Sequence, residues 1–216
     1  MEIYRKDASF KEKDIRKLFL LIGDSCFEQL YKHGYSDDKV AWMIYRWNMH
    51  FTDAFYDADY ENISIYTTPT KVDRFFSYRQ FIVKANDLML FKGTVEVIYV
   101  DKKTLRPVRA DDFGEDLIKI FDEEDIGDAY YDGSDNITDF VIKEAYIDGY
   151  KHVNNGVYVE EVSKLCDKRI KDLKIKYQKQ CLLGEDVKIA YRLNEDGADF
   201  RFFTDSEIKV YANVLY

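Results

Sequence analysis

The most chemically suggestive part of the chain is the run at 148–158, which reads Asp-Gly-Tyr-Lys-His-Val-Asn-Asn-Gly-Val-Tyr. A carboxylate, Asp148, precedes an imidazole, His152, by four residues. Asn154 and Asn155 then open a pattern with helical spacing. A base, a hydrogen-bond donor and the free N–H groups of a helix N-terminus would thus meet in one turn of chain. The alternative is that an asparagine merely caps the helix and His152 is an ordinary loop residue.

The elements around this run follow an order that occurs twice along the chain. In the second half a strand at 137–146 precedes a long helix at 154–170. Four strands follow, at 171–181, 186–193, 198–204 and 207–215. The first half has the same order, with a strand at 3–6 and a helix at 14–33. Its four later strands are predicted at 40–51, 61–68, 75–85 and 89–101. Short connections between the later strands favour hairpins, so both sheets should be antiparallel. The pattern predicts an α+β fold in which each sheet wraps around a buried helix.

An acidic segment separates the two halves. The net charge is −9, but residues 110–135 hold eleven acids and one base, so the remainder is near neutral. We therefore expect an N-terminal repeat at 1–109, an acidic linker at 110–135 and a C-terminal repeat at 136–216. The spacing of Leu117, Ile118 and Phe121 predicts a short helix inside this linker.

Composition excludes several classes of protein. The chain has 216 residues, 46% of them hydrophobic and 34% charged, which is typical of a globular protein. No apolar run approaches the ~20 residues of a membrane span, and the first residues lack the apolar core of a signal peptide. Three distant cysteines favour neither a disulfide framework nor a metal site, so we expect a cytoplasmic setting and no metal or other cofactor. The sequence has no basic stripe for nucleic acid.

Several motifs together resemble the acyl-acyl carrier protein (acyl-ACP) thioesterase family, whose members contain two hotdog domains. The run from Asp148 through His152, Asn154 and Asn155 to Tyr158 resembles that family's Asp-x-Asn-x-His-x-Asn-Asn-x-x-Tyr. Residues 177–181, Tyr-Gln-Lys-Gln-Cys, are similar to its Tyr-Arg-Arg-Glu-Cys. Residues 74–81 and 101–108 are similar to late strands of the family's first domain. The resemblance covers nearly the whole chain in order.

This resemblance implies a tandem double hotdog that hydrolyses the thioester of a fatty acyl-ACP to a free fatty acid. Asp148 would orient or activate water, and His152 would act as donor or proton carrier. Amides at the start of the helix, near Asn154 and Asn155, would polarise the carbonyl as negative charge develops on its oxygen. Acyl carrier protein is the implied partner, and a homodimer is an open alternative to a monomer.

Two positions depart from the family pattern. Tyr150 replaces the family's catalytic asparagine, and Gln180 replaces its catalytic glutamate. Tyr150 could still donate a hydrogen bond to substrate, and Gln180 could orient water, but a glutamine cannot serve as a base. Loss of general-base help would cost about 10²–10⁴-fold in rate. Two alternatives therefore stand beside the first interpretation: an acyl-coenzyme A thioesterase of the same fold, and a catalytically weak protein that binds acyl chains.

Two further features have a functional and a structural interpretation. Cys181 on a strand would share the phase of Leu173, Ile175 and Tyr177, which predicts a packed core cysteine rather than a nucleophile. Basic residues outnumber acids by seven to two over residues 164–179, where they are Lys164, Lys168, Arg169, Lys171, Lys174, Lys176 and Lys179. They could steer an acidic carrier protein, or they could simply form a solvated face.

Overall fold

In a computed structural model, residues 2–11, 14–34, 40–104, 106–109, 117–122, 128–131, 133 and 136–216 can be described. The chain divides into two compact units, Met1–Asp125 and Ile126–Tyr216, which are described separately below. Much of the predicted linker at 110–135 lies outside the described residues. Its predicted short helix does not form across 117–122, the part that is described.

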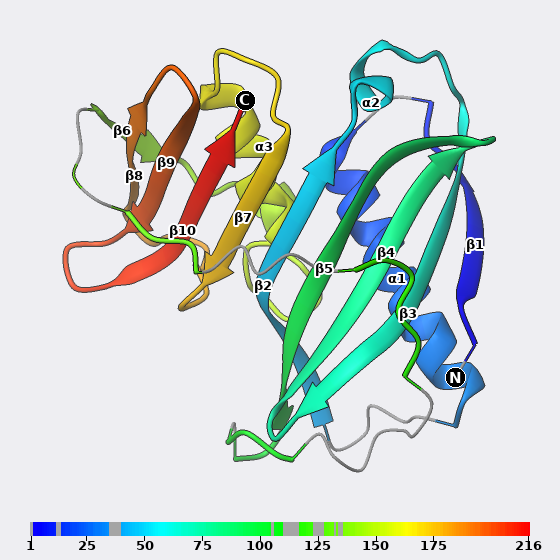
Figure 1. The fold of residues 1–216 in the computed structure, drawn as a ribbon. Coiled ribbons are helices and arrows are strands. Elements are labelled where there is room, and N and C mark those ends of the chain that lie inside the picture. Colours follow the sequence, from blue (N-terminus) through cyan, green and yellow to red (C-terminus); the bar gives the residue numbers. More distant parts are fainter. Residues whose placement is uncertain are drawn as a thin grey trace. The chain divides into compact units, whose positions relative to one another are not determined.

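The N-terminal unit is an antiparallel sheet with a long helix against one face (Figure 1). Its strands occur in the order β1-β3-β4-β5-β2, with bounds Tyr4–Ser9, Asn62–Asp73, Phe76–Ala85, Leu88–Asp101 and Val40–Phe51. The helix α1, Ile15–Lys32, begins where Asp14 accepts hydrogen bonds from the N–H groups of Arg16 and Lys17. A short helix that the sequence did not indicate, α2 at Asp53–Asp57, follows β2.

Apolar contacts fix α1 on its sheet. Leu18 and Ile22 of the helix are completely buried. The Phe19 ring meets the Trp47 ring of β2 edge-on, with centroids 5.0 Å apart. Burying each such side chain contributes about 1.5–3 kcal/mol, so the amphipathic face of α1 accounts for its position. The predicted first helix and the four strands after it are confirmed.

The C-terminal unit has the same plan in a smaller form (Figure 1). Its strands occur in the order β7-β10-β9-β8-β6, with bounds Asp172–Tyr177, Ile208–Leu215, Gly197–Phe203, Val187–Leu193 and Asn136–Phe140. The helix α3, Asn155–Leu165, packs Tyr158 against Phe202 and Tyr177, with ring centroids 5.2 and 5.6 Å apart.

Three boundaries in this unit differ from the prediction. The strand predicted at 137–146 is only β6, and a single 3-10 turn, η1 at Glu144–Tyr146, follows it. The helix ends at Leu165 rather than near 170, because Ile170 is buried and the Lys171 N–H donates to the Leu215 carbonyl, which starts β7. The strand predicted at 171–181 ends at Tyr177, so position 181 does not belong to it.

Within the described part of the chain, no helix is both long and apolar enough to cross a membrane.

Candidate active site

The Asp148–His152 run forms a tight loop between η1 and α3. Ile147 and Val153 form an isolated antiparallel bridge at its base. The Asp148 N–H donates to the His152 carbonyl at 2.8 Å, and the Lys151 N–H donates to the Asp148 carbonyl at 3.0 Å. Lys151 turns the chain with a φ of 66°, in the left-handed region that non-glycine residues seldom adopt. The four-residue spacing thus reflects a closed turn that returns the backbone to Asp148.

The Asp148 carboxylate holds this turn together. Its Oδ1 atom accepts the N–H of Tyr150 at 2.8 Å and the N–H of His152 at 3.1 Å. The turn therefore fixes the carboxylate by two backbone donors, which is the ordinary structural use of an aspartate in a loop. Within the described residues, no hydrogen bond engages Oδ2. Oδ2 is therefore the carboxylate oxygen that this turn leaves available for a further hydrogen bond.

His152 and Tyr150 belong to the same turn. The side chain of His152 is half-buried, and no ring hydrogen bond joins it to another described residue. Tyr150 is 56% exposed, at the tip of the turn. The turn thus presents one carboxylate oxygen, one imidazole and one phenol, and a backbone hydrogen bond, not an imidazole–carboxylate contact, joins Asp148 to His152.

The two asparagines hold the start of α3. The Oδ1 atom of Asn154 accepts the Gly156 N–H at 2.9 Å, and its carbonyl accepts the Val157 N–H at 2.9 Å. The carbonyl of Asn155 accepts the Tyr177 hydroxyl at 3.1 Å. Asn154 is therefore the helix cap that the structural interpretation foresaw. Two of the N–H groups predicted to polarise a carbonyl already have partners inside the chain.

Gln180 lies next to this turn, although it comes from a different part of the sequence. It is exposed, in the connection between β7 and β8. The Val153 N–H donates to the Cys181 carbonyl at 3.0 Å. This bond places the segment that contains Gln180 beside the end of the His152 turn. The structure therefore brings Asp148, His152 and Gln180 into one neighbourhood of the C-terminal unit.

Cys181 is buried, as predicted, but for a different reason. It lies beyond the end of β7, so the strand-phase argument was wrong. Its N–H is 3.3 Å from the Tyr158 hydroxyl, inside the aromatic core. Burial raises the pKa of the Cys181 thiol to about 11. The thiol is therefore protonated at neutral pH, which does not suit a nucleophile.

The basic residues after the helix start are largely paired. Lys164 binds Glu160 and Glu161 at 2.7 and 2.8 Å, and Lys176 binds Asp128 at 2.8 Å. Lys179 binds Glu207, and Lys168 donates to the Glu195 carbonyl at 2.7 Å. Pairing reduces the positive field that these residues could offer a carrier protein.

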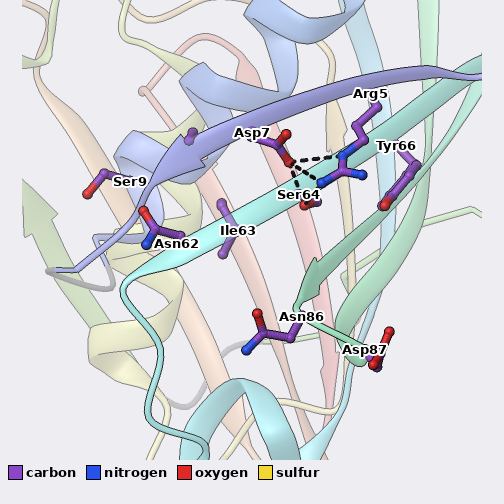
Figure 2. Close-up of a pocket in the computed structure, with 10 residues that line it drawn as sticks. Arg5, Asp7, Ser9, Asn62, Ile63, Ser64, Tyr66, Asn86 and Asp87 are labelled. Atoms are coloured by element: carbon purple, nitrogen blue, oxygen red, sulfur yellow. Dashed lines mark hydrogen bonds and ion pairs between the residues drawn. The ribbon is translucent and has the colours of Figure 1, made fainter.

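Two other features of the described residues concern metal binding and the position of a surface hollow. No group of histidine, cysteine, aspartate and glutamate side chains there is arranged to hold a metal ion. A hollow of about 700 Å³ lies on β1 and β3 of the N-terminal unit, and Figure 2 shows Arg5, Asp7 and Ser64 bonded to one another along it. None of the predicted site residues lines this hollow.

One buried charge beside the site was missed from the sequence. Lys209 is 2% exposed, and its ammonium binds Glu185 and Glu207. It is a single lysine inside an apolar strand pattern. The register of β10 against β9 shifts between Ile208 and Val210, so Lys209 is a bulge residue. The available sequence signal was a charged residue within a strand pattern of alternating apolar residues. That a bulge places this residue inside the protein becomes evident only when the strand register is known.

Comparison with known proteins shows which family the C-terminal unit resembles. Residues 131–212, which lie within the C-terminal unit, match the family model described as the acyl-ACP thioesterase C-terminal domain. The resemblance inferred from the sequence motifs is therefore confirmed for the C-terminal unit. No curated protein matches the chain by sequence.

Three solved structures resemble the chain over almost its whole length. An oleoyl thioesterase (putative) from Lactobacillus plantarum is 13% identical, with a TM-score of 0.80, covering 99% of this chain and 95% of that one. An acyl-ACP thioesterase from Bacteroides thetaiotaomicron is 16% identical, with a TM-score of 0.78 and coverages of 99% and 97%. The 12:0-ACP thioesterase from Umbellularia californica is 12% identical, with a TM-score of 0.77 and coverages of 99% and 96%.

At these identities the structural likeness establishes the fold, which is that of hotdog thioesterases. Family and fold together support hydrolysis of fatty acyl thioesters.

Proposed function

We propose that the chain is a tandem double-hotdog thioesterase that hydrolyses fatty acyl-ACP to free fatty acid. One observation carries the proposal: the Asp148–His152 turn, hydrogen-bonded through Val153 to the segment that contains Gln180. The domains proposed are the repeats at 1–109 and 136–216 with the acidic linker between them. The whole-length likeness to thioesterase structures supports both the fold and the reaction class.

In the proposed mechanism water attacks the thioester carbonyl. Asp148 Oδ2 and the Gln180 side chain orient this water, since Asp148 Oδ1 already accepts two N–H groups. As the carbon–oxygen bond forms, a proton passes to Asp148 or His152, and His152 can return it to the departing thiolate. The Tyr150 hydroxyl and a free amide near Asn155 are the proposed donors to the carbonyl oxygen.

The replacements Tyr150 and Gln180 predict a slow enzyme. Glutamine offers a hydrogen bond to water but cannot take its proton, so Asp148 is the only carboxylate proposed for this step. We propose that catalysis depends on positioning and on the Asp148–His152 pair. Activity would then be weaker than in family members that have a glutamate at the equivalent position, by up to about 10²–10⁴-fold.

The substrate carrier is the second element of the proposal. Acyl carrier protein is acidic, and the exposed Lys151 of the catalytic turn contributes charge toward it. The pairing of Lys164, Lys176 and Lys179 reduces the remaining basic face. An acyl-coenzyme A thioesterase is therefore the alternative to test. The second alternative is a protein that binds acyl chains without hydrolysing them, because Tyr150 and Gln180 replace the asparagine and glutamate that are catalytic in the family.

The test is a hydrolysis assay with matched acyl chains on acyl carrier protein and on coenzyme A. Release of free thiol is measured for the wild type and for Asp148→Asn, which keeps the oxygen that accepts the Tyr150 and His152 N–H groups but cannot act as a base. Faster turnover of the carrier-protein substrates, lost in Asp148→Asn, would support the proposal. Preference for coenzyme A would support the first alternative. Saturable acyl binding without turnover on either would support the second.

A further inference from the structure

Lys209 is the one charged residue of the C-terminal unit that is buried among the described residues. Its Nζ atom lies 2.8 Å from Glu185 Oε1 and 2.7 Å from Glu207 Oε1. Both carboxylates are partly exposed, at 28% and 29%. Removing an ammonium from water is unfavourable, and the two carboxylates compensate for it here. The contacts of Lys209 show which segment this buried charge holds in place.

The backbone of Lys209 holds the first part of the β7–β8 connection. The carbonyl of this bulge residue accepts two N–H groups, from Gln178 at 2.8 Å and from Lys179 at 3.0 Å. Bulges frequently redirect a side chain or a backbone group beside a functional site. The two residues just before Gln180 are therefore fixed to Lys209.

The side chain of Lys209 holds the last part of the same connection. Glu185, which binds its ammonium through Oε1, accepts the Leu182 N–H through Oε2 at 2.9 Å. Glu207, its other partner, binds Lys179. One lysine thus anchors the segment at 178–185 at both ends. Gln180 lies between the anchors, and its neighbour Cys181 accepts the Val153 N–H.

We infer that Lys209 is the positioning residue that holds Gln180 beside the Asp148–His152 turn. This inference rests on the proposed function, because it gives Gln180 a place in the hydrolytic site. Lys209 itself does not touch substrate. Its ammonium and carbonyl set the path of the 178–185 segment, so the distance from the Gln180 amide to the attacking water depends on the charge of a residue one strand away.

The first experiment measures hydrogen exchange, which does not depend on activity. Lys209→Met removes the ammonium and keeps a long apolar side chain. Amides at 178–182 should exchange at least about tenfold faster than in the wild type, because their local opening costs less free energy. The matched control is Lys176→Met, which removes another ion-paired lysine whose side chain is only 12% exposed. Unchanged exchange at 178–182 in Lys209→Met would overturn the inference.

The second experiment measures kinetics. In Lys209→Met we expect kcat to fall about tenfold with KM within about twofold, since the lost contact orients water rather than substrate. Lys209→Arg, which keeps the charge, should recover part of the rate. Gln180→Ala should lower kcat alone, and the double variant should be no slower than the slower single variant. Additive effects would overturn the inference.

Two outcomes separate this inference from the proposed function. If the wild type hydrolyses no thioester, the proposed function fails, and the exchange experiment still decides whether Lys209 fixes the segment. If the wild type is active but Lys209→Met is kinetically normal, only the inference fails. Should Lys209→Met not fold, Glu185→Gln replaces it. That variant keeps an acceptor for the Leu182 N–H and loses the ion pair, and faster exchange at 178–182 is again expected.

Discussion

The core of the N-terminal unit contains far more polar side chains than the core of the C-terminal unit. Among the described residues, ten of the eleven buried polar or charged side chains belong to the N-terminal unit, and Lys209 is the eleventh. In both units such a residue anchors an irregular segment. Gln80 bonds the Phe121 carbonyl and the Ile120 N–H, both at 2.7 Å, and so fixes residues 120–121 on its sheet. Lys209 does the same for 178–185.

The difference between the units lies in what the anchored segment contains. The segment held by Gln80 has no residue of the proposed chemistry, whereas the segment held by Lys209 contains Gln180. Two aspartates that accept backbone N–H groups make the same contrast. Asp14 accepts two N–H groups at the start of α1, and Asp148 accepts two in the 148–152 turn. Similar local roles thus serve stability in one unit and, in our proposal, catalysis in the other.

Replacing the two aspartates should give the largest difference between the units. Asp148→Ala should lower kcat by about 10²–10⁴-fold, because it removes the proposed base. Asp14→Ala should leave kcat unchanged and lower the free energy of unfolding by about 1 kcal/mol, the usual cost of a lost cap. Steady-state rates and urea unfolding of both variants check this. Near-normal rates in Asp148→Ala would reject the site.

His152→Ala extends the same test to the other member of the pair. We expect it to remove most of the hydrolytic activity with little loss of stability, since the imidazole makes no hydrogen bond to another described residue. Circular dichroism and thermal unfolding provide the control for folding. Full activity in this variant would leave His152 as an ordinary loop residue.

Gln180 and Gln80 should respond differently to the same substitution by glutamate. Gln180→Glu restores the carboxylate that the family resemblance implies and should raise kcat about tenfold. Near Asp148 the new acid should also raise a carboxyl pKa by like-charge repulsion, so rates are needed across pH. Gln80→Glu should instead destabilise the protein by about 1–3 kcal/mol, because a buried donor to the Phe121 carbonyl is lost. A flat or lower rate at every pH for Gln180→Glu would contradict the idea of a weakened enzyme.

Replacing each of the two buried cations should change the free energy of unfolding by a different amount. Arg79, in the N-terminal unit, is 2% exposed and donates to the Gln29 amide, with no carboxylate partner among the described residues. Arg79→Met should cost about 1 kcal/mol or less, because it removes a buried charge together with one hydrogen bond. Lys209→Met should cost about 2 kcal/mol, since two carboxylates lose their cation. Denaturant unfolding measures both, and the reverse order would contradict the comparison.

The smallest effect is expected at Cys181. Cys181→Ala should keep substantial turnover, and thiol reagents should react slowly with the native wild type, because the thiol pKa is raised to about 11. A raised pKa in the folded state favours the protonated thiol, so its contribution is complete below the ordinary thiol pKa and is lost as pH rises through about 11. The alkaline loss of stability should be shallower in Cys181→Ala. Rapid alkylation with full inactivation would instead indicate a nucleophile.

Local sequence patterns were enough to predict most of the secondary structure and the family resemblance. Apolar spacing of 3.6 and 2 residues located α1 and the four strands after it, because these periods reflect which face each element buries. The Asp148–Asn155 run and the 177–181 run identified the family, since both motifs are contiguous. The sequence also located a cap at the start of α3, because capping is a local interaction.

Features that depend on contacts between residues distant in sequence could not be predicted from local patterns. β7 ends at Tyr177 because the next two N–H groups bond to the Lys209 carbonyl, and no local pattern contains that bond. Cys181 is buried by Tyr158 rather than by strand phase. The short β6 and the early end of α3 likewise follow from pairing with distant strands. The buried Lys209 was invisible for the same reason: its bulge and both carboxylates are defined only when three separate segments meet.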